Sequence, residues 1–183
     1  VFPDGVDNLT GHGRINAYEA LKYTLENYGG TLRGEVVFTE DMNFTNGVTL
    51  TIEPGTTIKL DPGVDLWFRD NSKLIAVGTS SEPITFTSTQ SNPQPSSYGT
   101  IYLFGSNNQL EYCTVEYADW GVKIHGYPSA TSGNVVKNCT FRYNDQGLRL
   151  HNSTVTVENT TLENNRHAYV ILDNADVTIS KLS

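Results

Sequence analysis

Apolar and polar residues alternate through most of this chain with a period of two. The alternation is clear at Val48, Leu50 and Ile52, which threonines separate, and it returns about every eight residues as far as Ile84 and Phe86. Successive side chains of a β-strand point to opposite faces, so this period predicts short strands that are each buried on one face. Pro-Gly and Asn-Gly pairs between the runs predict turns. The spacing alone suits a sandwich or a barrel as well as a solenoid.

One segment near the amino terminus has a different period. Ile15, Tyr18, Leu21 and Leu25 recur at the three-and-four spacing of an amphipathic helix, and two glycines follow Tyr28. The sequence therefore predicts a single helix over residues 13–28. We expect it to cap the amino end of the strands that follow.

An internal repeat favours the solenoid. Residues 113–125 align without gaps to residues 139–151, and less regular copies begin at Ile84 and Thr160. The steps between the copies are 29, 26 and 21 residues, so the bare repeat is about 21 residues long and the excess forms loops. A repeat of that size is typical of one coil of a parallel β-helix.

Stacking the copies converts the alignment into columns of inward side chains. Fifteen of the sixteen positions in these columns are apolar or Cys, which is expected of a solenoid core and not of a sandwich. We therefore predict an all-β fold, a parallel β-helix of six to seven coils over residues 30–183, preceded by a separate segment and helix over residues 1–29. The predicted columns are Ile84, Cys113, Cys139 and Thr160; Phe86, Val115, Phe141 and Leu162; Ile101, Val122, Leu148 and Tyr169; and Leu103, Ile124, Leu150 and Ile171.

Two further features of the repeat carry predictions. Cys113 and Cys139 take the same inward position of neighbouring coils, and stacking directs both sulfurs the same way, so we predict buried free thiols. Val177 and Ile179 repeat the register of Val155 and Val157, which indicates that another coil begins near the carboxyl end. We expect this end to present an open solenoid face, so that either further coils follow in the parent protein or the end supports end-to-end self-association.

Charge and composition limit the classes of binding partner and the cellular location that we expect for this protein. The formal net charge is −8, from 12 basic and 20 acidic residues, which argues against nucleic acid as a partner because phosphates would repel such a surface. No apolar run approaches the roughly 20 residues of a membrane span. The low charged fraction and abundant Asn, Thr, Gly and Tyr are typical of exported β-rich proteins, so we expect a secreted or cell-surface location.

Two parts of the chain resemble known families. Residues 4–21, DGVDNLTGHGRINAYEAL, resemble the closing segment of subtilisin-like serine protease domains, although no residue of that family's catalytic triad can be carried over to this chain. Three other stretches resemble the right-handed β-helix region of bacterial and archaeal exported proteins. They are VTLTIEPGTTIKL, KLIAVGTSSEPITFTS and LEYCTVEYADWGVKI. Together the resemblances imply a right-handed β-helix module that follows a protease domain. They imply architecture more strongly than activity.

The outward positions of the second strand form a candidate binding surface. Cationic or titratable side chains adjoin aromatic ones there, an arrangement that suits an anionic polysaccharide or a cell-surface glycan, since sugars stack on aromatic faces and anionic groups pair with Lys and Arg. The loops over residues 88–98 and 126–133 could wall this surface with Tyr98 and Tyr127. The alternative is a solvated sheet face that the loops cover. The predicted outward columns are Tyr102, Lys123, Arg149 and Val170, and Phe104, His125, His151 and Leu172.

Two carboxylates are candidates for a catalytic pair. Asp119 and Asp145 take equivalent positions of neighbouring coils, about 4.8 Å apart along the backbone, which could set up the close pair of a retaining glycosidase. Each also stands two residues before a glycine, where aspartate usually shapes an Asx turn, and this interpretation is preferred. We include both in the candidate ligand-binding surface and expect no catalytic residue, metal site or cofactor.

Two function classes follow. The first is a non-catalytic β-helix module of an exported subtilisin-like protease, serving as a stalk, a substrate-binding element or a surface-attachment element. The alternative is an enzyme of pectate-lyase type that acts on an anionic polysaccharide through Lys123, His125, Arg149 and His151. Such a lyase needs several carboxylates on one outer face beside an arginine, and only Asp119 and Asp145 approach that arrangement.

Overall fold

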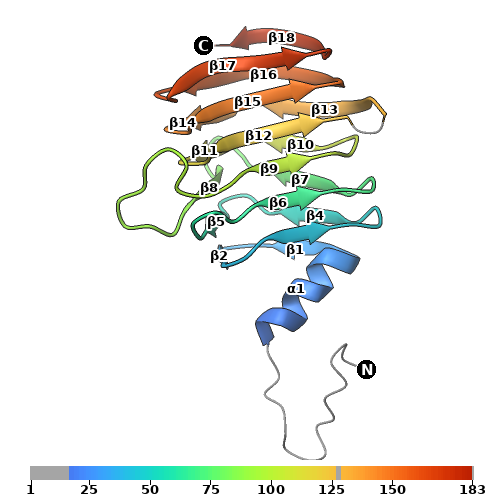
Figure 1. Ribbon diagram of the computed structural model, residues 1–183, viewed down its shortest axis with the longest axis vertical. Coiled ribbons are helices and arrows are strands. Elements are labelled where there is room, and N and C mark those ends of the chain that lie inside the picture. Colours follow the sequence, from blue (N-terminus) through green and yellow to red (C-terminus); the bar gives the residue numbers. More distant parts are fainter. Residues whose placement is uncertain (1–16, 127–128, 183) are drawn as a thin grey trace, which may run out of the picture.

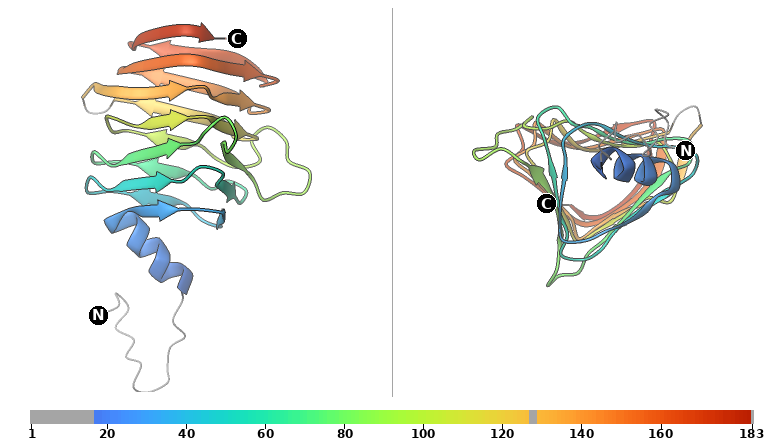
Figure 2. Two further views of the ribbon diagram at one scale, coloured as in Figure 1. Left: turned by 180° about the vertical axis from the view of Figure 1, so that it is seen from behind. Right: turned by 90° about the horizontal axis from the view of Figure 1, so that it is seen from below.

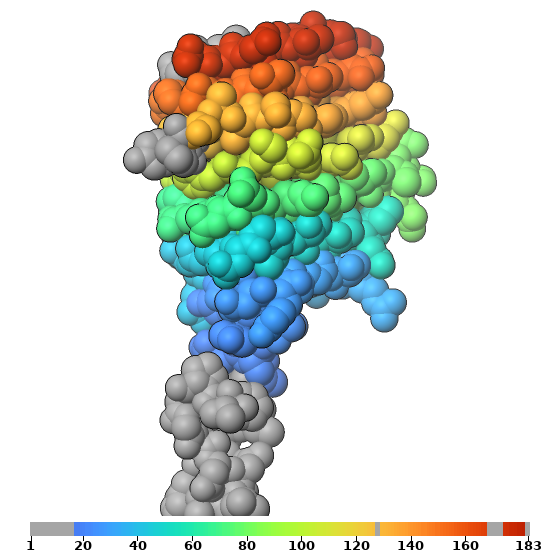
Figure 3. Space-filling model, turned by 90° about the vertical axis from the view of Figure 1, so that its right-hand side faces the viewer, coloured from blue at the N-terminus to red at the C-terminus, as the bar shows by residue number. Residues whose placement is uncertain are grey.

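The chain winds into a parallel solenoid, which a computed structural model describes for residues 17–126 and 129–182 (Figure 1). Each coil supplies one strand to each of three faces, so the solenoid is roughly triangular when it is viewed along its axis (Figure 2). All strand pairs are parallel and join neighbouring coils, which stack as layers (Figure 3). One face has six strands, in agreement with the predicted six to seven coils. The predicted all-β solenoid with one helix is confirmed.

The three faces follow one another along each coil. Face A contains β1 (Gly30–Leu32), β4 (Thr49–Ile52), β7 (Lys73–Val77), β10 (Gln109–Glu111), β13 (Thr131–Lys137), the first part of β16 (Ser153–Glu163) and β18 (Asp176–Leu182). Face B contains β2 (Glu35–Phe38), β5 (Thr57–Leu60), β8 (Ile84–Ser88), β11 (Cys113–Glu116), β14 (Thr140–Arg142) and the second part of β16. Face C contains β3 (Met42–Phe44), β6 (Leu66–Phe68), β9 (Ile101–Leu103), β12 (Trp120–His125), β15 (Gln146–His151) and β17 (His167–Asp173).

The helix α1 (Ala17–Tyr28) lies at the amino end of the solenoid (Figure 2). Leu25 is buried in the core, and the Glu26 carboxylate accepts the Asn43 backbone N–H at 2.7 Å, which ties the helix to β3. The predicted helix is confirmed over this range, while its first turn, residues 13–16, lies outside the described residues. Leu21 belongs to the predicted apolar stripe but is 53% exposed, so the helix covers the end with only part of that stripe.

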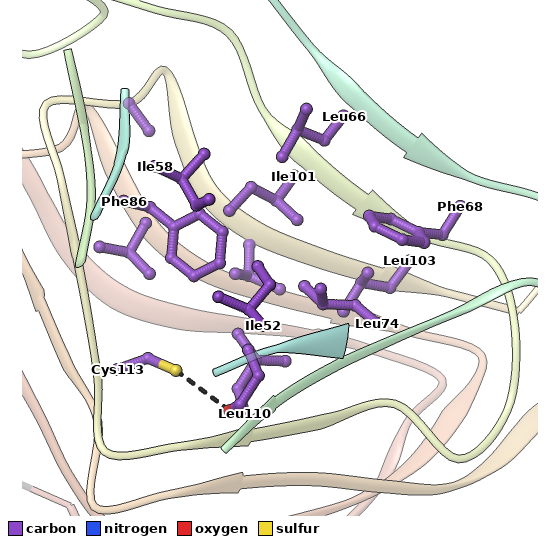
Figure 4. Packing of buried hydrophobic residues seen from close by; sticks show 14 of the residues in the cluster. Ile52, Ile58, Leu66, Phe68, Leu74, Phe86, Ile101, Leu103, Leu110 and Cys113 are labelled. Carbon is purple, nitrogen blue, oxygen red and sulfur yellow. Dashed lines mark hydrogen bonds between the residues drawn. The ribbon is translucent and has the colours of Figure 1, made fainter. Parts of the chain in front are cut away.

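The core consists of the inward columns that the repeat predicts. Cys113 pairs with Ile84, and Val115 lies between Phe86 and Phe141 in the ladder of face B. The inward side chains of β8, β11, β9, β12 and β15 are almost completely buried, Leu162 is partly buried, and buried residues of all three faces fill the interior (Figure 4). The predicted register of β18 is also confirmed, since Val177 pairs with Val155 and Ile179 with Val157. Self-association through that end stays a prediction.

One predicted register is wrong. In β17, Val170 pairs with Leu148 and Leu172 with Leu150, whereas the alignment had assigned those inward positions to Tyr169 and Ile171. The register shifts between Gln146 and Leu148, because β17 contains one residue more than β15 over this stretch. The predicted pairing of Tyr169 with Leu148 and of Ile171 with Leu150 is therefore replaced by a register that is shifted by one residue.

Two buried asparagine pairs line the corners of the solenoid. Asn144 accepts the Ala118 N–H at 2.9 Å through its side-chain oxygen, and its amide donates to the carbonyl of Val115 and to Asn165, each at 3.0 Å. Asn108 and Asn134 form the equivalent pair at another corner, at 2.9 Å. These amides pair backbone groups that the turns leave without a ladder partner, a role that the sequence analysis did not identify.

Cys113 and Cys139 are free and buried, as predicted. Each thiol donates to a backbone carbonyl at 3.3 Å, Cys113 to Ala76 and Cys139 to Leu110. Burial, followed by the hydrogen bond with Cys139, raises the pKa of the Cys113 thiol. The raised pKa disfavours the reactive thiolate of Cys113, and burial keeps reagents away from both sulfurs in the folded protein.

We therefore expect both thiols to be unreactive in the native protein. A colorimetric disulfide reagent should modify no cysteine before unfolding and both of the chain's two cysteines in denaturant. Rapid modification of either thiol under native conditions would contradict their placement in the core.

Candidate functional site

The outward side of face C carries a continuous band of aromatic and cationic side chains. In Figure 1 the strands of this face lie one above another toward the viewer. Their register places Trp67, Tyr102, Lys123 and Arg149 in one outward column, one residue per coil. A second column runs beside it at the ends of the strands. We call the whole set the outer strip, which comprises Trp67, Arg69, Tyr102, Phe104, Trp120, Lys123, His125, Arg149 and His151.

The aromatic rings of the outer strip stack on one another along the solenoid axis. The ring centroids of Trp67 and Tyr102 are 3.8 Å apart with an interplanar angle of 5°. The guanidinium of Arg69 lies 4.4 Å from the Trp67 ring centroid. Ring faces that contact each other are not available to a sugar, so the outer strip presents ring edges instead. Aromatic edges carry partial positive charge and attract anions, which changes the mode of binding predicted for Tyr102 from face stacking to edge contact.

The cations of the outer strip are held over aromatic faces. The Lys123 ammonium lies 5.5 Å from the Tyr102 centroid and 6.0 Å from the Trp120 centroid. The Arg149 guanidinium lies 5.1 Å from the Trp120 centroid. Cation–π contact restrains both flexible side chains while leaving their charge on an outer face. The two cations stand on adjacent coils, with Lys123 paired to Arg149 in the ladder.

The two histidines form their own stack at the ends of β12 and β15. His125 and His151 pair in the ladder, with ring centroids 4.4 Å apart and an interplanar angle of 16°. The ring centroids of Phe104 and His125 are 5.5 Å apart, with an interplanar angle of 59°. Burial lowers the pKa of His125, and the nearby His151, Lys123 and Arg149 lower it further. The neutral form of His125 is therefore favoured in the folded protein, and the stability that it contributes declines as the pH falls below the ordinary value of about 6.5.

The two candidate aspartates lie at one edge of the outer strip. The strand register makes Asp119 and Asp145 neighbours on adjacent coils, as predicted, since the Gln146 N–H donates to the Asp119 carbonyl at 2.9 Å. The Asp145 carboxylate accepts from Arg166 at 2.7 Å. The Asp119 carboxylate accepts from the Ser96 hydroxyl at 3.2 Å. Both carboxylates thus contact neighbouring segments of the solenoid.

A third carboxylate adjoins them. Burial raises the pKa of Asp65, while the hydrogen bond from the Thr100 N–H lowers it, and Asp41 and Asp119 raise it again. The distance from the Asp65 carboxylate to the Thr100 nitrogen is 2.6 Å.

Within the part of the chain that the structure describes, no group of three or more His, Cys, Asp or Glu side chains is arranged to hold a metal ion. No helix in the described ranges is long and apolar enough to span a membrane.

Sequence reasoning missed three members of the outer strip. Trp67 and Arg69 belong to a coil that the repeat alignment did not reach, although their alternation with Leu66 and Phe68 was a signal that could have placed them outward. Trp120 precedes a glycine that interrupts the alternation. Both tryptophans of the chain lie on this surface.

The first of the two predicted loop tyrosines, Tyr98, does not wall the outer strip as expected. Tyr98 is only 1% exposed and pairs with Ala118 in a short parallel bridge, so it belongs to the core and not to a groove. The rest of its loop, between β8 and β9, projects from the side of the solenoid (Figure 1). Tyr127, the second expected wall residue, lies outside the described residues.

Comparison with known proteins agrees with this architecture. A family described as right handed beta helix region matches residues 64–181, which is more than half of the chain. No curated protein and no solved structure matches the chain.

Proposed function

Because this chain belongs to the right-handed β-helix family, whose solenoid hosts many activities, we propose a function from its own surface: non-catalytic binding of an anionic polysaccharide along the outer strip. The module would serve an exported protein as a substrate-binding or surface-attachment element. An anionic cell-surface glycan is the partner class that this chemistry suits.

The observation that carries the proposal is the concentration of positive charge on one face of an acidic protein. The formal net charge is −8, yet the outer strip combines Arg69, Lys123 and Arg149 with two histidines. These cations lie over aromatic rings, which hold the positive charges at fixed positions on this face.

The geometry favours a ligand that lies along the solenoid axis. Neighbouring coils are separated by about 4.8 Å, so Lys123 and Arg149 present positive charges at a regular step. A linear glycan with an acidic group on each sugar presents negative charges repeatedly along its length. Stacked ring edges between Trp67 and Tyr102 extend the attractive surface toward the amino end.

We further propose that the parent protein is an exported subtilisin-like protease. This proposal is supported by the similarity of residues 4–21 to the closing segment of subtilisin-like protease domains, and by the position of that segment immediately before the solenoid in the sequence. The β-helix would then bring the protease to a glycan-bearing surface.

Removal of the two central cations should weaken binding. We expect the double variant Lys123→Ala/Arg149→Ala to bind oligogalacturonate or a sulfated oligosaccharide at least about tenfold more weakly, because hydrogen bonds to charged groups contribute about 1.5–3 kcal/mol each. Isothermal titration calorimetry measures the affinity. Raising the salt concentration should weaken the wild type as well, since exposed charges are screened.

A matched control removes the same charge elsewhere. Lys59→Ala/Lys137→Ala deletes two lysines from faces B and A, where they pair with Glu35 and Glu158. This control should keep nearly wild-type affinity. An equal loss in both double variants would show nonspecific attraction and reject the site. Appearance of unsaturated product absorbance during the titration would instead support the pectate-lyase alternative.

A further inference from the structure

The stacked histidines of the outer strip have a geometry that single surface histidines lack. His125 and His151 are held face to face, with centroids 4.4 Å apart, because they occupy the same position of two neighbouring coils. Phe104 packs against the outer side of His125 at 5.5 Å. The ladder therefore keeps the two residues next to each other, and their rings lie in contact. A charge placed on one of them acts directly on the other.

Cations surround this pair on its own strands. Lys123 lies two residues before His125 on β12, and Arg149 lies two residues before His151 on β15, both on the same outward side. Protonation of either imidazole adds positive charge to a face that is already positive, and like charges at short range disfavour ionisation. The lowered pKa of His125 agrees with this geometry.

The neighbouring elements contribute further charged and titratable groups. On the amino-terminal side these are Tyr102 of β9 and Arg69, which follows β6. At the edge of the strip, Asp65 and Asp119 act on Tyr102. On the carboxyl-terminal side, Asp173 of β17 takes the register position next to His151.

We propose that the His125–His151 stack is a proton-linked switch that strengthens binding of a polyanionic glycan to the outer strip as the pH falls. The switch rests on the proposed function. A bound polyanion supplies negative charge beside the imidazoles and offsets the repulsion from Lys123 and Arg149. Binding then takes up a proton, and by linkage a lower pH favours the bound state.

Dextran sulfate is a suitable probe, because its sulfate esters stay ionised throughout the range used and any pH dependence arises from the protein. We expect the wild-type affinity to rise about tenfold between about pH 7.5 and pH 5.5, since one linked proton changes affinity by at most about tenfold per pH unit. In His125→Gln/His151→Gln this dependence should be lost. The control His167→Gln removes an exposed histidine beside Asp145 and should keep the wild-type slope.

Two additional measurements separate the explanations. Asp65→Asn tests whether the carboxylate with a raised pKa is the source of the slope, and its slope should match that of the wild type. Nuclear magnetic resonance titration of the wild-type imidazole signals should show a higher histidine pKa when dextran sulfate is bound. Absence of binding at every pH would overturn the proposed function and the switch together. Binding with a flat profile, a slope that survives the double histidine substitution, or a slope lost in Asp65→Asn would overturn the switch alone.

Discussion

Replacing Phe141 with alanine is expected to lower the free energy of unfolding by about 3–5 kcal/mol, because the substitution leaves a cavity in a rigid core. Phe141 is fully buried and lies between Val115 and Leu162 in the ladder of face B. Its ring also packs beneath Gly121, where an added Cβ would lie 2.9 Å from the ring. Urea unfolding followed by circular dichroism measures the change.

A matched substitution on the outer surface of the same solenoid serves as the control for this loss of unfolding free energy. Phe104→Ala removes an equal side chain from the outer strip, where the ring is only half-buried. Its expected cost is about 1 kcal/mol, the value of a lost aromatic contact. A similar loss of stability in both variants would show that the inward columns do not dominate the stability of the solenoid.

Replacing Asn144 with leucine should lower the free energy of unfolding by about 2–5 kcal/mol. The substitution keeps the number and branching of the side-chain heavy atoms but leaves the Ala118 N–H and the Val115 carbonyl without their partner in a buried corner. Each unsatisfied buried group costs about 1–3 kcal/mol. Urea unfolding measures the total, and hydrogen exchange should show faster exchange at the Ala118 amide.

The control for this prediction is Asn174→Gly, because Asn174 has a φ of 49°, which glycine adopts without strain. The Asn174 amide donates to Asn152 at 3.2 Å on an exposed corner, where water can replace the lost contact. Its expected effect is within about 0.5 kcal/mol. Normal protection of the Ala118 amide in Asn144→Leu would mean that the asparagine pair does not hold that corner.

The inward columns could be predicted because two signals agree in them. Side-chain alternation identifies which residues of a strand share a face, and the gapless repeat then fixes how strands stack. For this reason the alignment correctly placed Cys113 and Cys139 in one inward column, and Val122 and Leu148 in another. The prediction failed in β17, where the repeat has diverged and one added residue changes the pairing without changing the composition.

The candidate site was predicted only in part. Tyr102, Lys123 and Arg149 share an outward column as the alignment indicated. The orientation of the rings could not be predicted, because it depends on contacts between coils and not on the order of residues within a strand. The stack of Trp67 on Tyr102 therefore altered the expected mode of binding. The buried role of Asn144 was equally hidden, since asparagine in a turn sequence ordinarily indicates a solvated Asx turn.

The backbone at the corner between faces A and B has a consequence for how such a gene can change length. Tyr112 and Asn138 both precede an inward cysteine, and both adopt the left-handed conformation, with φ of 49° and 53°. Loss of residues 113–138 by recombination between the repeats would join Tyr112 directly to Cys139 without altering that conformation. The strands on either side already share one register, because Gln109 aligns with Val135 and Val135 with Thr156. A whole coil can therefore be deleted or duplicated in frame with every remaining column intact, so that copy number sets the reach of the outer strip.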